Sequence, residues 1–319
     1  MRRGGTRRLI ALAALALAAS PARAAPLDPL QVADARVQTI GWKLARGNAA
    51  YCGRVGPSVG LLLQDVRNYS DPARARALLG LAGDIAVEAA ADGSPAQAAG
   101  LEANDAVLAI GGESMAALPP ARKGDWQRLW DLHARIDALL QRDGKVSLTV
   151  MHAGAERTVT LTGEPACAVR FELDTTGSSA KATRDRVIVT FDLYRGVGGD
   201  EAMVAAAMAH EFAHAVLDHQ GLLDRLGRGM TKVRHTEEEA DRLSVWLLAN
   251  AGYDPDDAER FMRSWGKDHD PGFLGMPDHD RPGTRAKIIR TEIKALDAAE
   301  AKDPDHAANW PRDFVRQKI

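Results

Sequence analysis

The side chains most able to do chemistry form one run of five residues, His210-Glu211-Phe212-Ala213-His214. The alanine-rich surroundings predict a helix, and helical residues four apart lie on one face, about 6 Å apart along the axis. The imidazoles of His210 and His214 could then close on one ion, for which zinc is the natural occupant. Glu211 would point towards the open coordination position, where a carboxylate can accept a proton from water. The run therefore predicts a catalytic zinc site with a general base beside it.

The helix that must position these residues is expected to begin at Asp200-Glu201, because acidic side chains in a first turn suit the helix dipole. It is expected to run to about His219, since Gly221 suits its end. A β-branched stretch at 187–191 predicts a buried strand just before the helix. The zinc-binding pair thus falls in the middle of a helix that follows a strand.

A catalytic zinc usually has three protein ligands, so one more must come from elsewhere in the chain. His219 lies one turn and one residue beyond His214, on a face of a continuous helix rotated away from the pair. We therefore expect His219 to be an ordinary surface or core histidine. The acidic run Glu237-Glu238-Glu239 opens a second apolar helix, and a Glu on an antiparallel helix could reach the ion from the opposite side. Taken singly, each of these glutamates is explained more simply as a solvated residue at a helix start, where the helix dipole favours acidic side chains.

The strand, the helix with its two histidines and the downstream Glu237-x-x-x-Asp241 resemble the gluzincin family of CAAX prenyl proteases and HtpX-type and BepA-type bacterial proteases. The likeness covers residues 185–295. It implies that Glu237 is the third ligand of one zinc ion per chain and that Asp241 holds the free N–H of a ligating imidazole. It also implies a peptide hydrolase in which Glu211 is the general base.

One segment departs from that family. Relatives often carry His-Pro followed by an Arg, whereas this chain has His279-Asp280-Arg281-Pro282 and then Arg285. Because the family's segment approaches the active site, the resemblance makes His279, Arg281 and Arg285 candidates for stabilising an oxyanion or covering the metal. Each of them singly is more simply a loop or helix residue.

A second resemblance covers residues 55–163. Gly-Ser-Pro-Ala at 93–96, Ala-Gly-Leu at 99–101 and a later strand that ends in Gly-Gly resemble a bacterial PDZ domain of the kind attached to periplasmic proteases. We expect strands at 59–63, 85–89, 146–151 and 157–161, a helix at 125–142, and loops at 65–78 and 112–124.

A PDZ domain binds an extended peptide along an open sheet edge and holds its carboxylate with backbone N–H groups. The resemblance therefore makes Val59, Gly60, Leu61 and Leu62 the candidate peptide-binding residues, with the helix at 125–142 as the far wall of the groove. The alternative is that the domain packs against the protease only as a scaffold.

Length and composition describe an ordinary globular protein. The chain has 319 residues, 26% charged side chains and a formal net charge of -2, which leaves no basic surplus for nucleic acid. Abundant alanine favours helices over a sheet sandwich. We expect an α+β fold: a mainly α-helical zincin-type metalloprotease domain with a short edge strand at 168–300, preceded by an N-terminal helix at 25–54 and a small β-rich PDZ domain at 55–165, and followed by a loose tail at 301–319.

The first residues predict export. Four arginines precede an apolar run at 9–19 and an Ala-Arg-Ala end, which is typical of a signal peptide at 1–24; an uncleaved anchor is the alternative. The mature chain, with no transmembrane segment, would then lie in the periplasm or outside the cell. Cys52 and Cys167 could form a disulfide there, although two free thiols remain the alternative because sequence does not show proximity.

These features favour an exported zinc endopeptidase. Its substrates would be polypeptides, such as unfolded envelope proteins or protein C-termini, in quality control or processing. The alternative is a PDZ-based peptide-binding or chaperone-like protein that keeps a zinc fold with little or no turnover. Glu211 argues against that alternative, because a structural zinc site has no need of a base.

Overall fold

The computed structural model describes residues 28–119, 121–268, 280–304 and 308–317. The predicted signal peptide at 1–24 and His279 lie outside these ranges. Within them, no helix has both the length and the apolar character that a membrane crossing requires.

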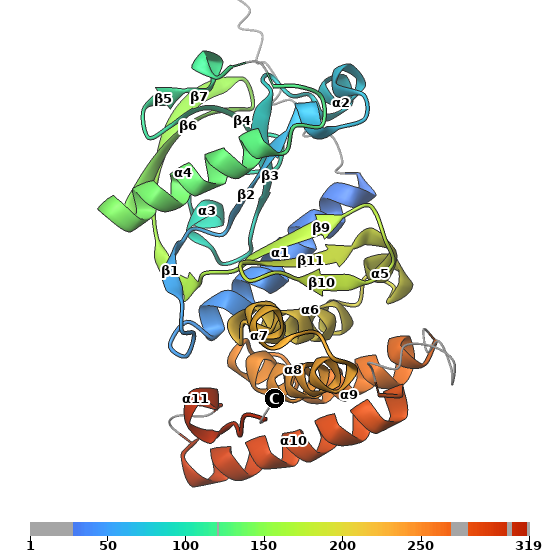
Figure 1. The fold of residues 1–319 in the computed structure, drawn as a ribbon. Coiled ribbons are helices and arrows are strands. Elements are labelled where there is room, and N and C mark those ends of the chain that lie inside the picture. The colour runs from blue at the N-terminus through green and yellow to red at the C-terminus, as the bar shows by residue number, and fades with distance from the viewer. Residues whose placement is uncertain (1–27, 120, 269–279, 305–307, 318–319) are drawn as a thin grey trace, which may run out of the picture.

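Two hydrophobic cores organise a mixed α and β fold whose sheets are mostly antiparallel, in agreement with the expected α+β class (Figure 1). One core lies in a helical unit, formed by the first helix and the chain from residue 166 onwards. The other lies in a β-rich unit at residues 59–161. The helices of the helical unit are α1 (Pro29–Gly47), α5 (Phe191–Gly196), α6 (Glu201–Val216), α7 (His219–Leu226), α8 (Met230–Asn250), α9 (Asp256–Phe261), the π-helix η3 (Met262–Gly266), α10 (Pro282–Lys302) and α11 (Trp310–Asp313).

The first helix belongs to the core of the helical unit, although the sequence predicted it as a separate element. Asp28 caps α1 by accepting the backbone N–H groups of Leu30 and Gln31. Its buried face includes Ile40 and Leu44, which join the core around α6 and α8. The helical unit is therefore built from two stretches of chain that are far apart in sequence.

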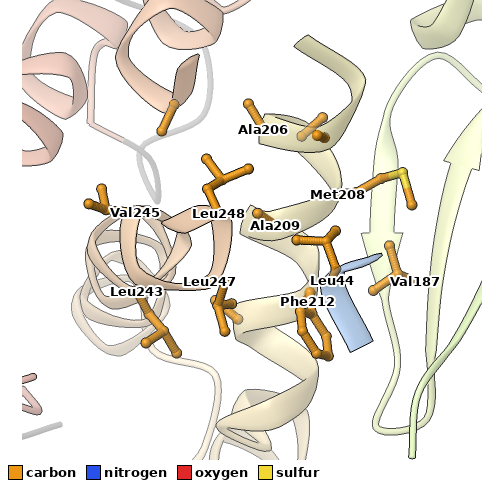
Figure 2. Packing of buried hydrophobic residues seen from close by; sticks show 14 of the residues in the cluster. Leu44, Val187, Ala206, Met208, Ala209, Phe212, Leu243, Val245, Leu247 and Leu248 are labelled. Carbon is orange, nitrogen blue, oxygen red and sulfur yellow. The ribbon is translucent and has the colours of Figure 1, made fainter. Parts of the chain in front are cut away.

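Large apolar side chains fill the space between α6, α8 and the neighbouring strands. Figure 2 shows Phe212 and Met208 of α6 beside Leu44 and Val187, and Leu247 of α8 on the other side of the same helix. The alanines of α6 let α8 approach closely, because they add little bulk between the helix axes. This packing fixes the rotation of α6 and hence the direction in which its histidines point.

A sheet in the β-rich unit carries one helix on its face. Its strand order is β2-β3-β4-β6-β7, with β5 paired to β4. Leu132, Ile136 and Leu140 of the helix α4 pack into the core against this sheet. The elements are β2 (Leu61–Asp65), η1 (Val66–Asn68), α2 (Pro72–Leu79), β3 (Ile85–Ala90), α3 (Pro95–Ala98), β4 (Ala106–Ile110), β5 (Glu113–Ser114), η2 (Met115–Ala117), α4 (Gln127–Asp143), β6 (Lys145–His152) and β7 (Ala155–Thr162).

The predicted loop at 65–78 is wrong, because α2 lies within this segment. Asp71 caps the helix by accepting the N–H of Arg74, and Pro72 stands in its first turn. The cap and the proline were visible in the sequence. The helix was missed because Ala75 is its only buried residue, so its sequence has no helical spacing of apolar residues.

The chain crosses between the two units at one place, here called the neck, which consists of β1 (Val55–Ser58), β8 (Glu164–Cys167) and the two cysteines. The chain leaves the helical unit after α1 and returns along β8, which pairs antiparallel with β1. At the same place Cys52 and Cys167 form a disulfide across 115 residues of sequence, with their Cα atoms 5.6 Å apart. The β-rich unit is therefore an insertion whose two ends are clamped together.

A second, three-stranded sheet lies on the helical unit beside α6. β11 (Arg186–Thr190) is its middle strand, parallel to β9 (Arg170–Asp174) and antiparallel to β10 (Ala180–Ala182). Thr190 ends β11 and caps α5 by accepting the N–H of Leu193. The order places β10 at one end of this sheet.

Candidate metal centre

The helix α6 carries the two motif histidines on one face. Asp200 begins it by accepting the N–H groups of Ala202 and Met203. The helix ends at Val216 and not near His219, because Asp218 adopts a left-handed backbone with φ of 53°. A new helix, α7, then starts at His219 and turns that side chain back towards α6.

The helix α8 begins at Met230, earlier than the predicted start at Glu237. The acidic run therefore lies inside the helix, where successive residues lie on different faces and have different neighbours. Glu237 faces the histidines of α6, while Glu238 accepts a hydrogen bond from Gln317. Glu239 and Asp241 are buried, with 0% and 1% of their surface exposed.

Donor groups of three residues meet where α6 and α8 face each other. His210 Nε2 lies 3.3 Å from His214 Nε2 and 3.3 Å from Glu237 Oε2, and His214 Nε2 lies 3.4 Å from Glu237 Oε1. Donors placed tetrahedrally about zinc at 2.0–2.1 Å stand roughly 3.3–3.4 Å from one another. The two histidine nitrogens have this spacing, and the carboxylate of Glu237 approaches each of them through a different oxygen, so the set can hold a metal ion.

His210 is supported directly by a clamped carboxylate. Its Nδ1 lies 3.0 Å from Asp241 Oδ1, and Arg285 donates two hydrogen bonds of 2.7 Å to that same carboxylate. Burial opposes the charge of Asp241, but Arg285 outweighs it and holds the pKa of Asp241 at about 2. Burial likewise disfavours a charged His210, yet Asp241 and Glu237 raise the pKa of His210 to about 10. The cluster therefore favours a positive charge where the donors meet.

His214 is supported through a second imidazole. Its Nδ1 lies 2.9 Å from Nδ1 of His219, and His219 Nε2 lies 3.0 Å from Glu239 Oε2. His219 is therefore a core histidine, one of the two expected outcomes, but its contact with His214 was not expected. A continuous helix would have rotated it away, but the helix break at Asp218 brings it back. No local pattern in the sequence signals that break.

The third donor and the motif glutamate open onto a large cavity. Its volume is about 760 Å³, and Glu211, both motif histidines and Glu237 line it. The strand β10 forms one wall, and Trp265 and Arg281 line another part. Arg281 and Arg285 thus border the cavity, as the resemblance implied, and Arg285 is also bonded to Asp241.

The candidate peptide-binding residues of the β-rich unit do not line this cavity. Val59 and Leu61 are buried, and the space beside Gly60, Leu61 and Leu62 is about 50 Å³, enough for a water molecule or two but not for a peptide. Residues of α1 and β9 form its other walls. In addition, the N–H of Leu63 on the β2 edge donates to His133 Nε2 of α4 at 3.3 Å. This hydrogen bond occupies one backbone group of the strand edge, and the small space, which no residue of α4 lines, is not the predicted groove.

Neither a protein-family model nor a curated protein matches this chain. The resemblances to gluzincins and PDZ domains therefore stay predictions from motifs. The geometry of the metal centre carries the case for function.

Proposed function

We propose that this chain is a zinc-dependent endopeptidase. The observation that carries the proposal is the set of three residues placed to hold one metal ion, with Glu211 beside them on the wall of a 760 Å³ cavity. Structural zinc sites are closed by four protein ligands, whereas catalytic sites keep one position open. Among the residues that the structure describes, only His210, His214 and Glu237 gather as donors.

The proposed chemistry divides between the ion and one carboxylate. When bound, zinc would supply Lewis acidity towards water and towards the carbonyl group of a peptide bond. Glu211 takes a proton from the attacking water and passes it to the nitrogen of the departing amine. To bind the ion, His210 and His214 would each present an Nε2 lone pair, which requires the remaining ring proton to sit on Nδ1. No protein nucleophile is needed.

The wall formed by β10 supports a polypeptide substrate. The N–H of Thr183 donates to the carbonyl of Arg186, so these two residues form a hydrogen-bonded pair of the antiparallel ladder. Pair types alternate along such a ladder, which directs the backbone groups of Ala180 and Ala182 away from β11. In the described part of the chain β10 pairs with β11 alone, and Ala180 and Ala182 line the cavity. An extended peptide can add to this edge as a further strand.

The disulfide supports a location of the protein outside the reducing cytosol. A bridge between Cys52 and Cys167 persists in an oxidising compartment, which agrees with the predicted export signal. We therefore propose periplasmic or extracellular polypeptides as substrates, with unfolded envelope proteins as the class to test first. The β-rich unit would bind peptide ends along the edge of β2.

Metal removal and return test the proposal. Protein stripped by a chelator should not cleave casein, an unstructured substrate, and one equivalent of zinc per chain should restore cleavage. His214→Ala should lose both zinc and cleavage, because two donors hold the ion far more weakly than three. Cleavage that persists in the stripped protein, or in His214→Ala, would contradict a zinc mechanism.

A further inference from the structure

We propose that the C-terminal segment, residues 310–317, is a working part of the metal centre: Arg316 fixes Glu239, Glu239 fixes His219, and His219 orients the ring of His214. The inference rests on the proposed metal centre but not on peptide hydrolysis. Residues 219 and 239 would act as positioning residues, since neither faces the point where the three donors meet.

The hydrogen bonds form one directional chain. If His214 offers its Nε2 to a metal, its proton lies on Nδ1 and is donated to Nδ1 of His219 over 2.9 Å. His219 must then carry its own proton on Nε2, which is donated to Glu239 Oε2 over 3.0 Å. Only this order of donors leaves the ligating lone pair of His214 free. The carboxylate of Glu239 therefore selects the tautomer of the metal ligand His214 through two successive hydrogen bonds.

The C-terminal segment supplies the groups that keep this carboxylate charged. Arg316 Nε donates to Glu239 Oε1 at 2.6 Å, and the backbone N–H of Gln317 donates to the same oxygen at 2.9 Å. Glu239 has 0% of its surface exposed, so it would be costly to bury without such partners. The expectation of a loose tail is thus wrong for the described residues.

Apolar contacts hold the segment in place. Trp310 and Phe314 are buried in the core of the helical unit, and the guanidinium of Arg242 lies 4.9 Å from the ring centre of Phe314. Two aromatic residues in an otherwise polar tail were the signal for this docking in the sequence. The segment is therefore anchored before its polar end reaches Glu239.

The support of His210 repeats the pattern without the extra imidazole. There, Asp241 contacts the ring and Arg285 clamps the carboxylate with two hydrogen bonds. Each ligating histidine thus has a carboxylate from α8 and an arginine from a more C-terminal element. A repeated arrangement around two ligands of one ion favours a role at the ion over a general role in packing.

The test measures metal binding directly, by competition of zinc with a chromophoric chelator and by the visible absorption spectrum of the Co²⁺-loaded protein. Glu239→Gln should weaken zinc binding about 10- to 100-fold, as loss of such outer partners does. Arg316→Ala should weaken it in the same direction but less, and both should shift the Co²⁺ bands. Arg312→Ala is the matched control, because this arginine of the same segment pairs with Asp303 and Asp313 and has 45% exposure against 50% for Arg316.

Unchanged zinc affinity and an unchanged Co²⁺ spectrum in folded Arg316→Ala and Glu239→Gln would overturn the proposal, as would an equal loss in Arg312→Ala. Circular dichroism verifies the fold, and the half-exposed Arg316 keeps the test available if Glu239→Gln does not fold. The wild type could also fail to cleave peptides while Arg316→Ala and Glu239→Gln both bind zinc more weakly. That result would uphold the role of the C-terminal segment and overturn the hydrolase function. The two proposals therefore fail separately.

Discussion

Both units bury charged groups, but they arrange them differently. In the β-rich unit, Asp65 pairs with Arg128 and Asp105 with His152, and each pair ties two neighbouring elements together. In the helical unit, Asp241 and the pair of His219 with Glu239 approach His210 and His214 from two sides, beside a large cavity. Since burying charge opposes folding unless it is compensated, its convergence on one point indicates a site. Both units contain buried charged side chains, but among the described residues it is only in the helical unit that several of them gather around one point.

The largest expected effect concerns the neck between the units. Replacing Cys52 and Cys167 by Ser should lower the free energy of unfolding by about 4–5 kcal/mol, because the bridge closes a loop of 115 residues in the unfolded chain. Denaturant titration of the oxidised protein and the double variant would measure this. Zinc affinity should stay the same, since the neck touches no donor; a parallel loss of zinc would show that the two units are not separable.

Two aspartates sharpen the comparison, because they are matched in burial and in partner. Asp65 and Asp241 are each 1% exposed, and each accepts two hydrogen bonds of 2.7 Å from one arginine. Asp241→Asn should weaken zinc binding about 10- to 100-fold, whereas Asp65→Asn should leave it unchanged. Chelator competition on both folded variants decides. Equal effects would mean that convergence on the histidines has no special meaning.

The smallest expected effects are opposite pH dependences in two places. The pKa of Glu239 is held at about 2, chiefly by His219 and Arg316 against the effect of burial, so its stabilisation is complete above about pH 4.5 and is lost as pH falls towards 2. Burial instead raises the pKa values of Asp34 on α1 and Glu88 on β3, where the two units meet; repulsion from Asp28 adds to the first shift and repulsion from Asp34 to the second. Stability from that contact is complete at acid pH and is lost as pH rises through the raised pKa values.

Denaturant unfolding of wild type, Glu239→Gln and Glu88→Gln between pH 3 and pH 9 would separate these contributions. Glu239→Gln should flatten the acid side of the stability curve, and Glu88→Gln the alkaline side. Curves with the same shape in all three proteins would refute the assignment of either group.

Elements with a strong local signal were predictable from the sequence. The alanine-rich α6 with its Asp200 cap, and the β6–β7 hairpin turned at Gly154, lie close to their expected places. The donor Glu237 came from a resemblance, and the structure then placed it at 3.3 Å from His210. The break at Asp218 could not be predicted, because a left-handed residue inside a helical pattern leaves no periodic mark.

Features that depend on contacts between distant residues also escaped prediction. The strand β9 is short and pairs with β11, not with the strand that follows it in the chain, and α8 starts at Met230, well before the acidic run. The role of Glu239 depends on Arg316, which lies far along the sequence. Sequence patterns identified the ion's donors better than the groups that hold those donors in place.

The most direct test of the central claim compares peptide cleavage by wild type and Glu211→Gln at full zinc occupancy. The variant should bind one zinc ion per chain and lose at least about 100-fold in kcat/KM on an unstructured protein, since general bases contribute that much or more. Glu156→Gln, an exposed glutamate of β7, is the control and should keep full activity. Zinc-loaded Glu211→Gln that cleaves at the wild-type rate would contradict the account.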